Sequence, residues 1–232
     1  YLSKFDYLEV DSDIQLQEGF NSVREITEFY SLGNEENEKE NTYLSKNYVI
    51  GNTMDKKLSL TFQILSYVLL DASGAPVKQA LIDAGIGKDI FGYYEDEILQ
   101  PMFIITAKNS DEDKKEQFIN IINDTLAKLV RDGINDKSLL AAINFYEFRY
   151  READYGRFPK GLMYGLRIMS SWLYDDDKPF VHLSDNEGYA FLREQIGTGY
   201  YETVIQKYLL DNTHSSLVIL KPKKGLNNEK EE

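Results

Sequence analysis

The sequence contains no cysteine and only two histidines among its 232 residues. The absence of cysteine excludes disulfide bonds and thiolate metal sites, and it favours a reducing compartment. The histidines, His182 and His214, lie 32 positions apart, and neither has a glutamate at helical spacing. A zinc hydrolase needs imidazole and carboxylate ligands that converge on the metal, commonly from one helix face. We therefore predict that this chain holds no catalytic and no metal-binding residues.

Long apolar runs and an excess of basic charge are also missing. A membrane span takes about 20 apolar residues, so the sequence predicts no membrane partner. The chain has 39 acidic and 26 basic residues, a formal net charge of −13. Nucleic-acid binding needs a basic face, so nucleic acid is excluded as the expected partner, whereas basic peptides remain compatible with this charge.

Hydrophobic residues make up 42% of the chain, which is enough for the core of one large domain. Alternating residues predict strands over Arg24 to Tyr30 and Tyr43 to Ile50. The polar stretch Gly33 to Asn41 lies between them and suits a solvated loop. We expect these two strands to pair as a hairpin.

A helix and its interruption follow. Leu58, Phe62, Leu65 and Leu69 recur at helical spacing. The stretch Asp71 to Gly87, DASGAPVKQALIDAGIG, then breaks the helix with small residues. Pro76 suits the first turn of a new helix, and Gly85 suits its left-handed end.

The remaining pattern predicts two strands, a block of helices and a last strand. The strands are Ile90 to Tyr94, Pro101 to Lys108 and Ser215 to Leu220, and helices cover most of Ser110 to Leu210. Runs of strands separated by helix blocks predict an α+β fold with helices packed on one face of a sheet. We expect a linker or packed arm over 1–22, one domain over 23–221 and a charged tail over 222–232.

Several phrases in the chain resemble one peptidase family. They are TYLSKNYVIG, LSYVLLDASGAPVKQALIDAGIGKDIFGYYEDEILQPMFIITAKN, EFRYREADYGRFPKGLMYGL, SWLYDDDKP and VILKP. Together they resemble the second domain of the presequence-protease branch of the pitrilysin/insulinase zinc peptidases, family M16, subfamily C. The chain opens at Tyr1 without an initiator methionine, and we expect a piece of a longer protein whose helical linker follows the charged tail.

The resemblance implies a fold and a role. Family members close four related α+β domains around a chamber, with a mixed, mainly antiparallel sheet in each. The zinc motif belongs to the first domain and is absent here, so this chain would be inactive and would bind no cofactor itself. It would form part of the chamber and bind substrate for an ATP-independent zinc metallopeptidase that degrades unfolded peptides.

The resemblance also implies a site. Related enzymes anchor the substrate on a strand edge of this domain. The corresponding positions here are Gly74 at the helix break and the strand Ile90, Phe91, Gly92, Tyr93 and Tyr94. An exposed strand edge offers N–H and C=O groups to any extended peptide. The expected partners are therefore extended peptides and the other M16 domains of the same parent chain.

Two alternatives stay open at this point. The chain could be a purely structural or docking module of the same fold, without a role in proteolysis. The aromatic residues of Ile90 to Tyr94 could simply pack the sheet, with Gly92 marking a bulge. The composition favours a bacterial cytoplasmic location, with an organellar matrix as the alternative.

Overall fold

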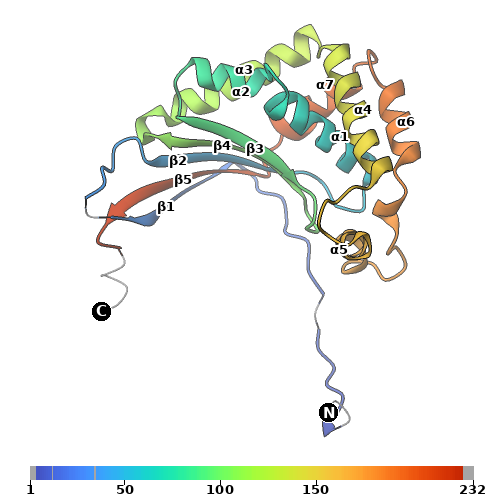
Figure 1. Ribbon diagram of the computed structural model, residues 1–232. Coiled ribbons are helices and arrows are strands. Elements are labelled where there is room, and N and C mark those ends of the chain that lie inside the picture. The colour runs from blue at the N-terminus through green and yellow to red at the C-terminus, as the bar shows by residue number, and fades with distance from the viewer. Residues whose placement is uncertain (1–3, 12, 34, 227–232) are drawn as a thin grey trace.

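The computed structural model describes residues 4–11, 13–33 and 35–226. Figure 1 shows one sheet with the helices on a single side of it. The strands are β1 (Arg24–Leu32), β2 (Thr42–Val49), β3 (Asp89–Glu95), β4 (Met102–Ser110) and β5 (Ser215–Lys224). The α-helices are α1 (Lys56–Ser66), α2 (Pro76–Asp83), α3 (Lys115–Asp132), α4 (Asp136–Glu152), α5 (Lys160–Trp172), α6 (Asn186–Glu194) and α7 (Tyr200–Ile205). Shorter helical turns are η2 (Tyr67–Asp71), η3 (Glu112–Lys114), η4 (Val181–Leu183) and η5 (Gln206–Leu210).

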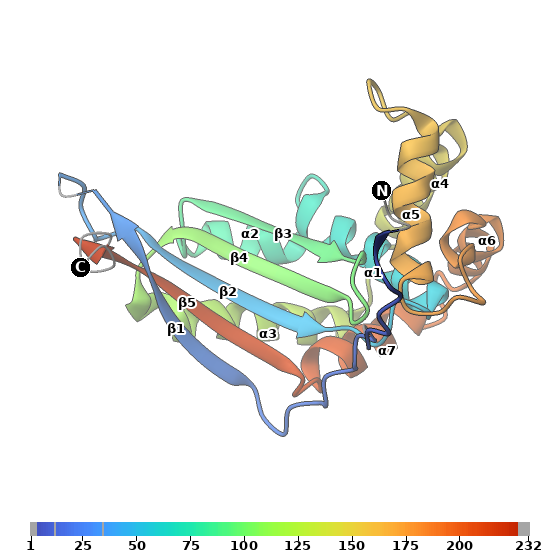
Figure 2. The same ribbon diagram turned by 90° about the horizontal axis from the view of Figure 1, so that it is seen from below.

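The sheet has the strand order β1-β5-β2-β4-β3, which Figure 2 shows from below. β1 and β5 are parallel, and the other neighbours are antiparallel. This arrangement confirms the predicted α+β class and the mixed, mainly antiparallel sheet.

The predicted hairpin between the first two strands is wrong, because β5 lies between β1 and β2. The burial of the strands explains this order. The first six residues of β1 are exposed, as suits an edge strand. β5 is half-buried or buried on both faces through Ser215 to Leu220, as suits an interior strand.

The core lies between the sheet and the helix layer. The predicted helical stripe is confirmed: Leu58, Phe62, Leu65 and Leu69 are buried on α1 and η2. The Phe62 ring lies 5.8 Å from the Phe103 ring of β4, measured between ring centroids. Burying such a side chain contributes about 1.5–3 kcal/mol, so this stripe anchors the helices to the sheet.

The helix break follows from local backbone chemistry. α1 widens into a π-helical turn, η2, which ends where the Ala72 N–H donates to the Tyr67 carbonyl. Gly74 then has a φ of 71°, a left-handed conformation that glycine adopts at little cost. Pro76 begins α2, where its missing N–H is not needed. By length and composition Lys56–Asp83 could cross a membrane, but 67% of its most apolar window is buried inside the fold.

The segment before β1 forms an extended arm. In Figure 1 it leaves the sheet on the side opposite the helices. The Gln17 N–H donates to Gln100 Oε1 at 2.7 Å, and the Phe20 carbonyl accepts from Thr213 Oγ1 at 2.8 Å. Further out, the arm exposes apolar side chains that include Tyr7 and Leu8.

One charged side chain lies inside the core. Lys46 of β2 shares the helix-facing side with Leu44 and Tyr48 and is only 6% exposed. Its Nζ donates to Ser215 Oγ at 2.9 Å. Burial disfavours the ammonium and lowers the pKa of Lys46 to about 8.

This burial makes the stability depend on pH. The unfolded chain keeps the ordinary lysine pKa of 10.5, so between pH 8 and 10.5 it binds more protons than the folded protein. We expect the free energy of unfolding to rise across this range by about 3 kcal/mol through Lys46. Urea unfolding at several pH values measures this, and Lys46→Met should remove the rise. Lys137→Met, on the exposed start of α4, is the control and should leave the profile unchanged. Parallel profiles for the parent and Lys46→Met would contradict the assignment.

Candidate functional site

The predicted peptide-binding strand is β3, which is the outermost strand on the side of the sheet away from β1 (Figure 2). Its side chains alternate between two environments. Ile90 is 1% exposed, whereas Phe91 is 38% and Tyr93 is 47% exposed. Phe91 and Tyr93 therefore project from the open face of the sheet, the face without helices.

Ile90, Gly92 and Tyr94, which alternate with them, face the helix layer. The Tyr94 ring stacks on Phe62 with centroids 5.5 Å apart, and burial raises the pKa of the Tyr94 hydroxyl. A Cβ at Gly92 would overlap the Ile104 carbonyl oxygen and come within 2.6 Å of Leu70 Cδ1. Gly92 therefore lets η2 pack closely on β3. Any peptide contact of Ile90, Gly92 and Tyr94 would be through their backbone atoms.

Gly74, the remaining predicted site residue, lies in the loop between η2 and α2. Both of these elements contact β3. Gly74 itself is exposed, and no atom lies within 4 Å of where its Cβ would be. Gly74 thus lies in a loop between two elements that pack on β3. Its role in peptide binding stays a prediction.

A row of small polar side chains crosses the open face beside β3. Ser45 Oγ lies 3.0 Å from Thr106 Oγ1 and donates to Asn47 Oδ1 at 3.0 Å. Asn47 Nδ2 donates to Ser216 Oγ at 3.4 Å. Thr106 is directly opposite Phe91, so this polar row adjoins the exposed aromatic residues. This row was not predicted from the sequence. The alternation in TYLSKNYV was the available signal, but it does not say which strands are neighbours.

A polar cleft adjoins the C-terminal end of β3. Two cavities of 210 and 310 Å³ share Gln63, Asp96, Tyr155 and Arg167 in their walls. Gln63 Nε2 donates to Asp96 Oδ2 at 2.6 Å. Asp185, which is 1% exposed, pairs with Arg167 at 2.8 Å and with Lys56 at 3.2 Å. These ion pairs tie α1 and α5 together through Asp185.

The two histidines lie in different parts of the fold. His182 of η4 is next to the cleft, with Nε2 3.3 Å from Thr53 Oγ1, and burial lowers its pKa. His214, just before β5, packs edge-on against Phe20 of the arm with centroids 4.6 Å apart. Within residues 4–11, 13–33 and 35–226, no three His, Asp or Glu side chains gather closely enough to hold a metal ion. The side chains of the described residues therefore do not form a zinc site.

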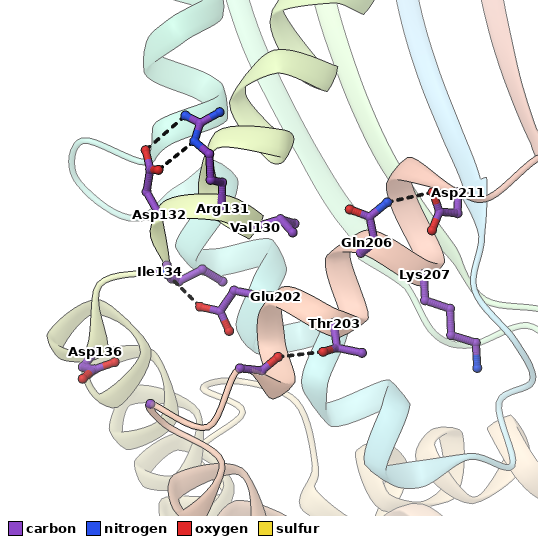
Figure 3. A pocket seen from close by; sticks show the side chains of 13 residues that line it. Val130, Arg131, Asp132, Ile134, Asp136, Glu202, Thr203, Gln206, Lys207 and Asp211 are labelled. Carbon is purple, nitrogen blue, oxygen red and sulfur yellow. Dashed lines mark hydrogen bonds and ion pairs between the residues drawn. The ribbon is translucent and has the colours of Figure 1, made fainter.

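A larger cavity, of 880 Å³, lies in the helix layer away from β3. Figure 3 shows it between the end of α3 and the α7–η5 segment. Several of its polar groups bond to one another: Arg131 pairs with Asp132 at 2.8 Å, and Glu202 accepts from the Ile134 N–H at 2.8 Å. Gln206 likewise donates to Asp211 at 2.7 Å. This internal pairing suits a structural groove better than a reactive site.

The sequence of this chain is similar to a known protein family and to several proteins. The family model described as the peptidase M16 inactive domain matches residues 1–146. The chain is 42% identical over 230 residues to Protein HypA of Clostridium perfringens, covering 99% of this chain and 24% of that protein. It is 29% identical over 217 residues to presequence protease 1, chloroplastic/mitochondrial, of Arabidopsis thaliana, covering 91% and 20%. The chain thus spans a quarter or less of the length of these relatives.

Solved structures share the fold at low sequence identity. A protease from Helicobacter pylori superposes with a TM-score of 0.69 at 15% identity, covering 94% of this chain and 49% of that one. A peptidase M16 inactive domain from Pseudomonas fluorescens gives a TM-score of 0.58 at 12% identity, covering 90% and 46%. At these identities the likeness concerns the fold.

The close packing at Gly92 can be tested by adding one methyl group. We expect Gly92→Ala to destabilise the domain by about 1–3 kcal/mol, because the Cβ would push η2 away from β3. Gly165→Ala in α5 is the matched control, since nothing lies within 4 Å of its Cβ position. A glycine-to-alanine change inside a helix should stabilise by up to about 1 kcal/mol. Urea unfolding of both variants measures the difference, and an unchanged midpoint for Gly92→Ala would contradict the packing.

Proposed function

Because the chain belongs to the M16 peptidase family, whose inactive-domain model matches residues 1–146, we propose that it is the substrate-binding, chamber-forming domain of a longer zinc metallopeptidase. The family match and the presequence-protease relatives confirm the resemblance found in the sequence. M16 metallopeptidases generally use zinc, which activates water for peptide hydrolysis. We assign that chemistry to another domain of the longer chain, and no step of it to this one. The proposed parent is ATP-independent and degrades unfolded peptides.

The observation that carries this proposal is the outer edge of β3. β3 ends the sheet, so one side of its backbone has no strand partner within the described residues. Such an edge can accept an extended peptide as an added strand, with main-chain hydrogen bonds that do not depend on the peptide sequence. Sequence-independent binding suits a peptidase that takes many unfolded substrates.

The surroundings of β3 would favour particular peptides. Phe91 and Tyr93 offer apolar contacts to every second side chain of an added strand. Asp89 and Glu95 lie at the two ends of β3, and the whole chain carries a net charge of −13. We therefore propose extended peptides of basic character as the preferred substrates.

The open face of the sheet would serve as part of the chamber wall. Its polar row of Ser45, Asn47, Thr106 and Ser216 is satisfied by internal hydrogen bonds. This row itself carries no charge. Helices cover the opposite face, so the open face is the one left for an enclosed space (Figure 1).

A docking role for the chain is supported by α5. Leu162, Leu166, Met169 and Leu173 are exposed and are spaced by four, three and four positions, which places them on one helix face. An exposed apolar stripe of this length is typical of an interaction surface. We propose that another M16 domain of the same chain covers it. A module with this docking role alone is the second candidate function.

The relatives also bear on location. Protein HypA is from a bacterium, and the Arabidopsis relative is named chloroplastic/mitochondrial. We propose a bacterial cytoplasmic location for the parent, with an organellar matrix as the alternative.

Peptide binding at the β3 edge can be measured with a labelled peptide. We expect a fluorescein-labelled, proline-free basic peptide to bind this chain, and the double variant Phe91→Ser/Tyr93→Ser to bind it at least about tenfold more weakly, because two apolar contacts are lost. Fluorescence anisotropy gives both affinities. Phe148→Ser is the matched control, since Phe148 is an exposed aromatic on α4.

A second arm of the same experiment tests the backbone contacts. A peptide with N-methyl groups on alternate amides cannot form one row of main-chain hydrogen bonds and should bind more weakly. Equal affinity for the methylated and unmethylated peptides would contradict strand addition, and equal affinity for both protein variants would contradict the assignment to β3.

Docking through α5 can be tested by comparing this domain alone with the full-length parent. We expect Leu162→Glu/Leu166→Glu to change the unfolding free energy of this domain alone by less than about 0.5 kcal/mol, because both side chains are exposed. In the full-length parent the same pair should open the domain arrangement, seen as a larger radius of gyration in X-ray scattering. Phe148→Glu serves as the control, and an unchanged radius would count against docking through α5.

A further inference from the structure

The buried amine of Lys46 lacks the partners that its charge calls for. An ammonium has three N–H donors, yet Lys46 Nζ has one hydrogen bond, to Ser215 Oγ at 2.9 Å. It also lies 4.8 Å from the centroid of the Tyr48 ring. Among residues 4–11, 13–33 and 35–226, no carboxylate forms an ion pair with it. Burying an ammonium without a counterion is costly, so the site favours an anion.

A cavity of 300 Å³ opens next to this amine, on the helix-facing side of the sheet. Six of its ten lining residues are apolar or aromatic, and they come from β2, β5, α3, η5 and the segment before β1. The apolar residues that line it are Val23, Tyr48, Ile119, Leu209, Leu210 and Leu217. The Tyr48 hydroxyl is buried and has no hydrogen-bond partner within the described chain. The cavity thus combines apolar walls with a buried cation and a second polar group that lacks a partner.

The remaining polar groups around the cavity already have partners or lie at its exposed rim. Glu25 accepts from Lys115 Nζ at 2.8 Å. Asn212 Nδ2 donates to the Val49 and Tyr208 carbonyls, and its Oδ1 accepts from the His214 N–H. Asn123 is exposed at the rim. Lys46 is therefore the one lining cation that faces the cavity among the described residues.

We propose that this cavity binds a small monocarboxylate with a short apolar tail. The carboxylate would accept hydrogen bonds from the Lys46 ammonium, and the tail would lie against Ile119, Leu209 and Leu217. The volume is at the lower end of the range for small-molecule pockets, which fits a ligand of a few carbon atoms. The cavity is on the opposite face of the sheet from the proposed peptide site, so the two proposals stand independently.

The probe for this proposal is sodium butyrate, with 1-butanol as the uncharged control and inorganic phosphate as the control without an apolar tail. Lysine side chains of the 232-residue chain are labelled with ¹³C and followed by NMR while pH is varied. We expect saturating butyrate to keep Lys46 protonated to higher pH, which raises its apparent pKa from about 8 by at least one unit, a tenfold shift. Glu25 and Lys115 at the rim, and the Tyr48 hydroxyl beside the amine, are the other groups to follow in the same titration.

Two variants decide whether the effect belongs to this cavity. Lys46→Met removes the cation and should weaken butyrate binding at least tenfold. Val23→Trp adds bulk at the exposed Val23 and keeps Lys46, and it should also weaken butyrate binding, so the test stands even if Lys46→Met does not fold. The proposal is overturned if butyrate leaves the Lys46 titration unchanged, if butanol or phosphate shifts it equally, or if Val23→Trp binds butyrate as the parent does.

Discussion

A side chain at Gly92 would overlap two neighbours, the Ile104 carbonyl of β4 and Leu70 of η2. This contact sets the depth at which η2 sits on the sheet, and with it the helix break that follows. Once η2 is seated, Ile90 and Tyr94 must point into the core, because β-strand side chains alternate. Phe91 and Tyr93 are then left on the open face. The proposed peptide site is a consequence of how tightly the opposite face is packed.

Local patterns in the sequence predicted the helices well. The Leu58–Leu69 stripe, Pro76 at the start of α2 and Gly85 with its positive φ all have causes within a few residues of chain. The strand pairing was harder. Alternation identified β1 and β2 as strands, but the insertion of β5 between them depends on residues almost 200 positions away. Local spacing carries no information about that pairing.

The candidate site, too, could be predicted from the sequence only in part. The β3 residues came from a family resemblance, and the structure adds which of them face outward. Ser45, Asn47 and Thr106 became a row only when β2 and β4 were placed side by side. Lys46 lies two positions from Leu44 and two from Tyr48 in TYLSKNYV, so strand alternation puts it on the same face as both. That position predicts burial, which the charge of a lysine would ordinarily argue against. The cavity beside it depends on α3 and η5, which no local pattern places there.

The two faces of the sheet thus have separate uses. The open face and the edge of β3 suit extended peptides in the longer peptidase, while the helix side holds a cavity with a buried cation. Neither face gathers three side chains suited to bind zinc among the described residues.

The central claim is that β3 accepts a peptide as an additional strand. Amide hydrogen exchange, followed residue by residue by NMR with and without a saturating basic peptide, tests it most directly. The account predicts new protection at alternate amides of β3, those directed away from β4, together with NOEs between peptide and β3 backbone protons. Protection confined to other elements, or none at β3, would contradict it.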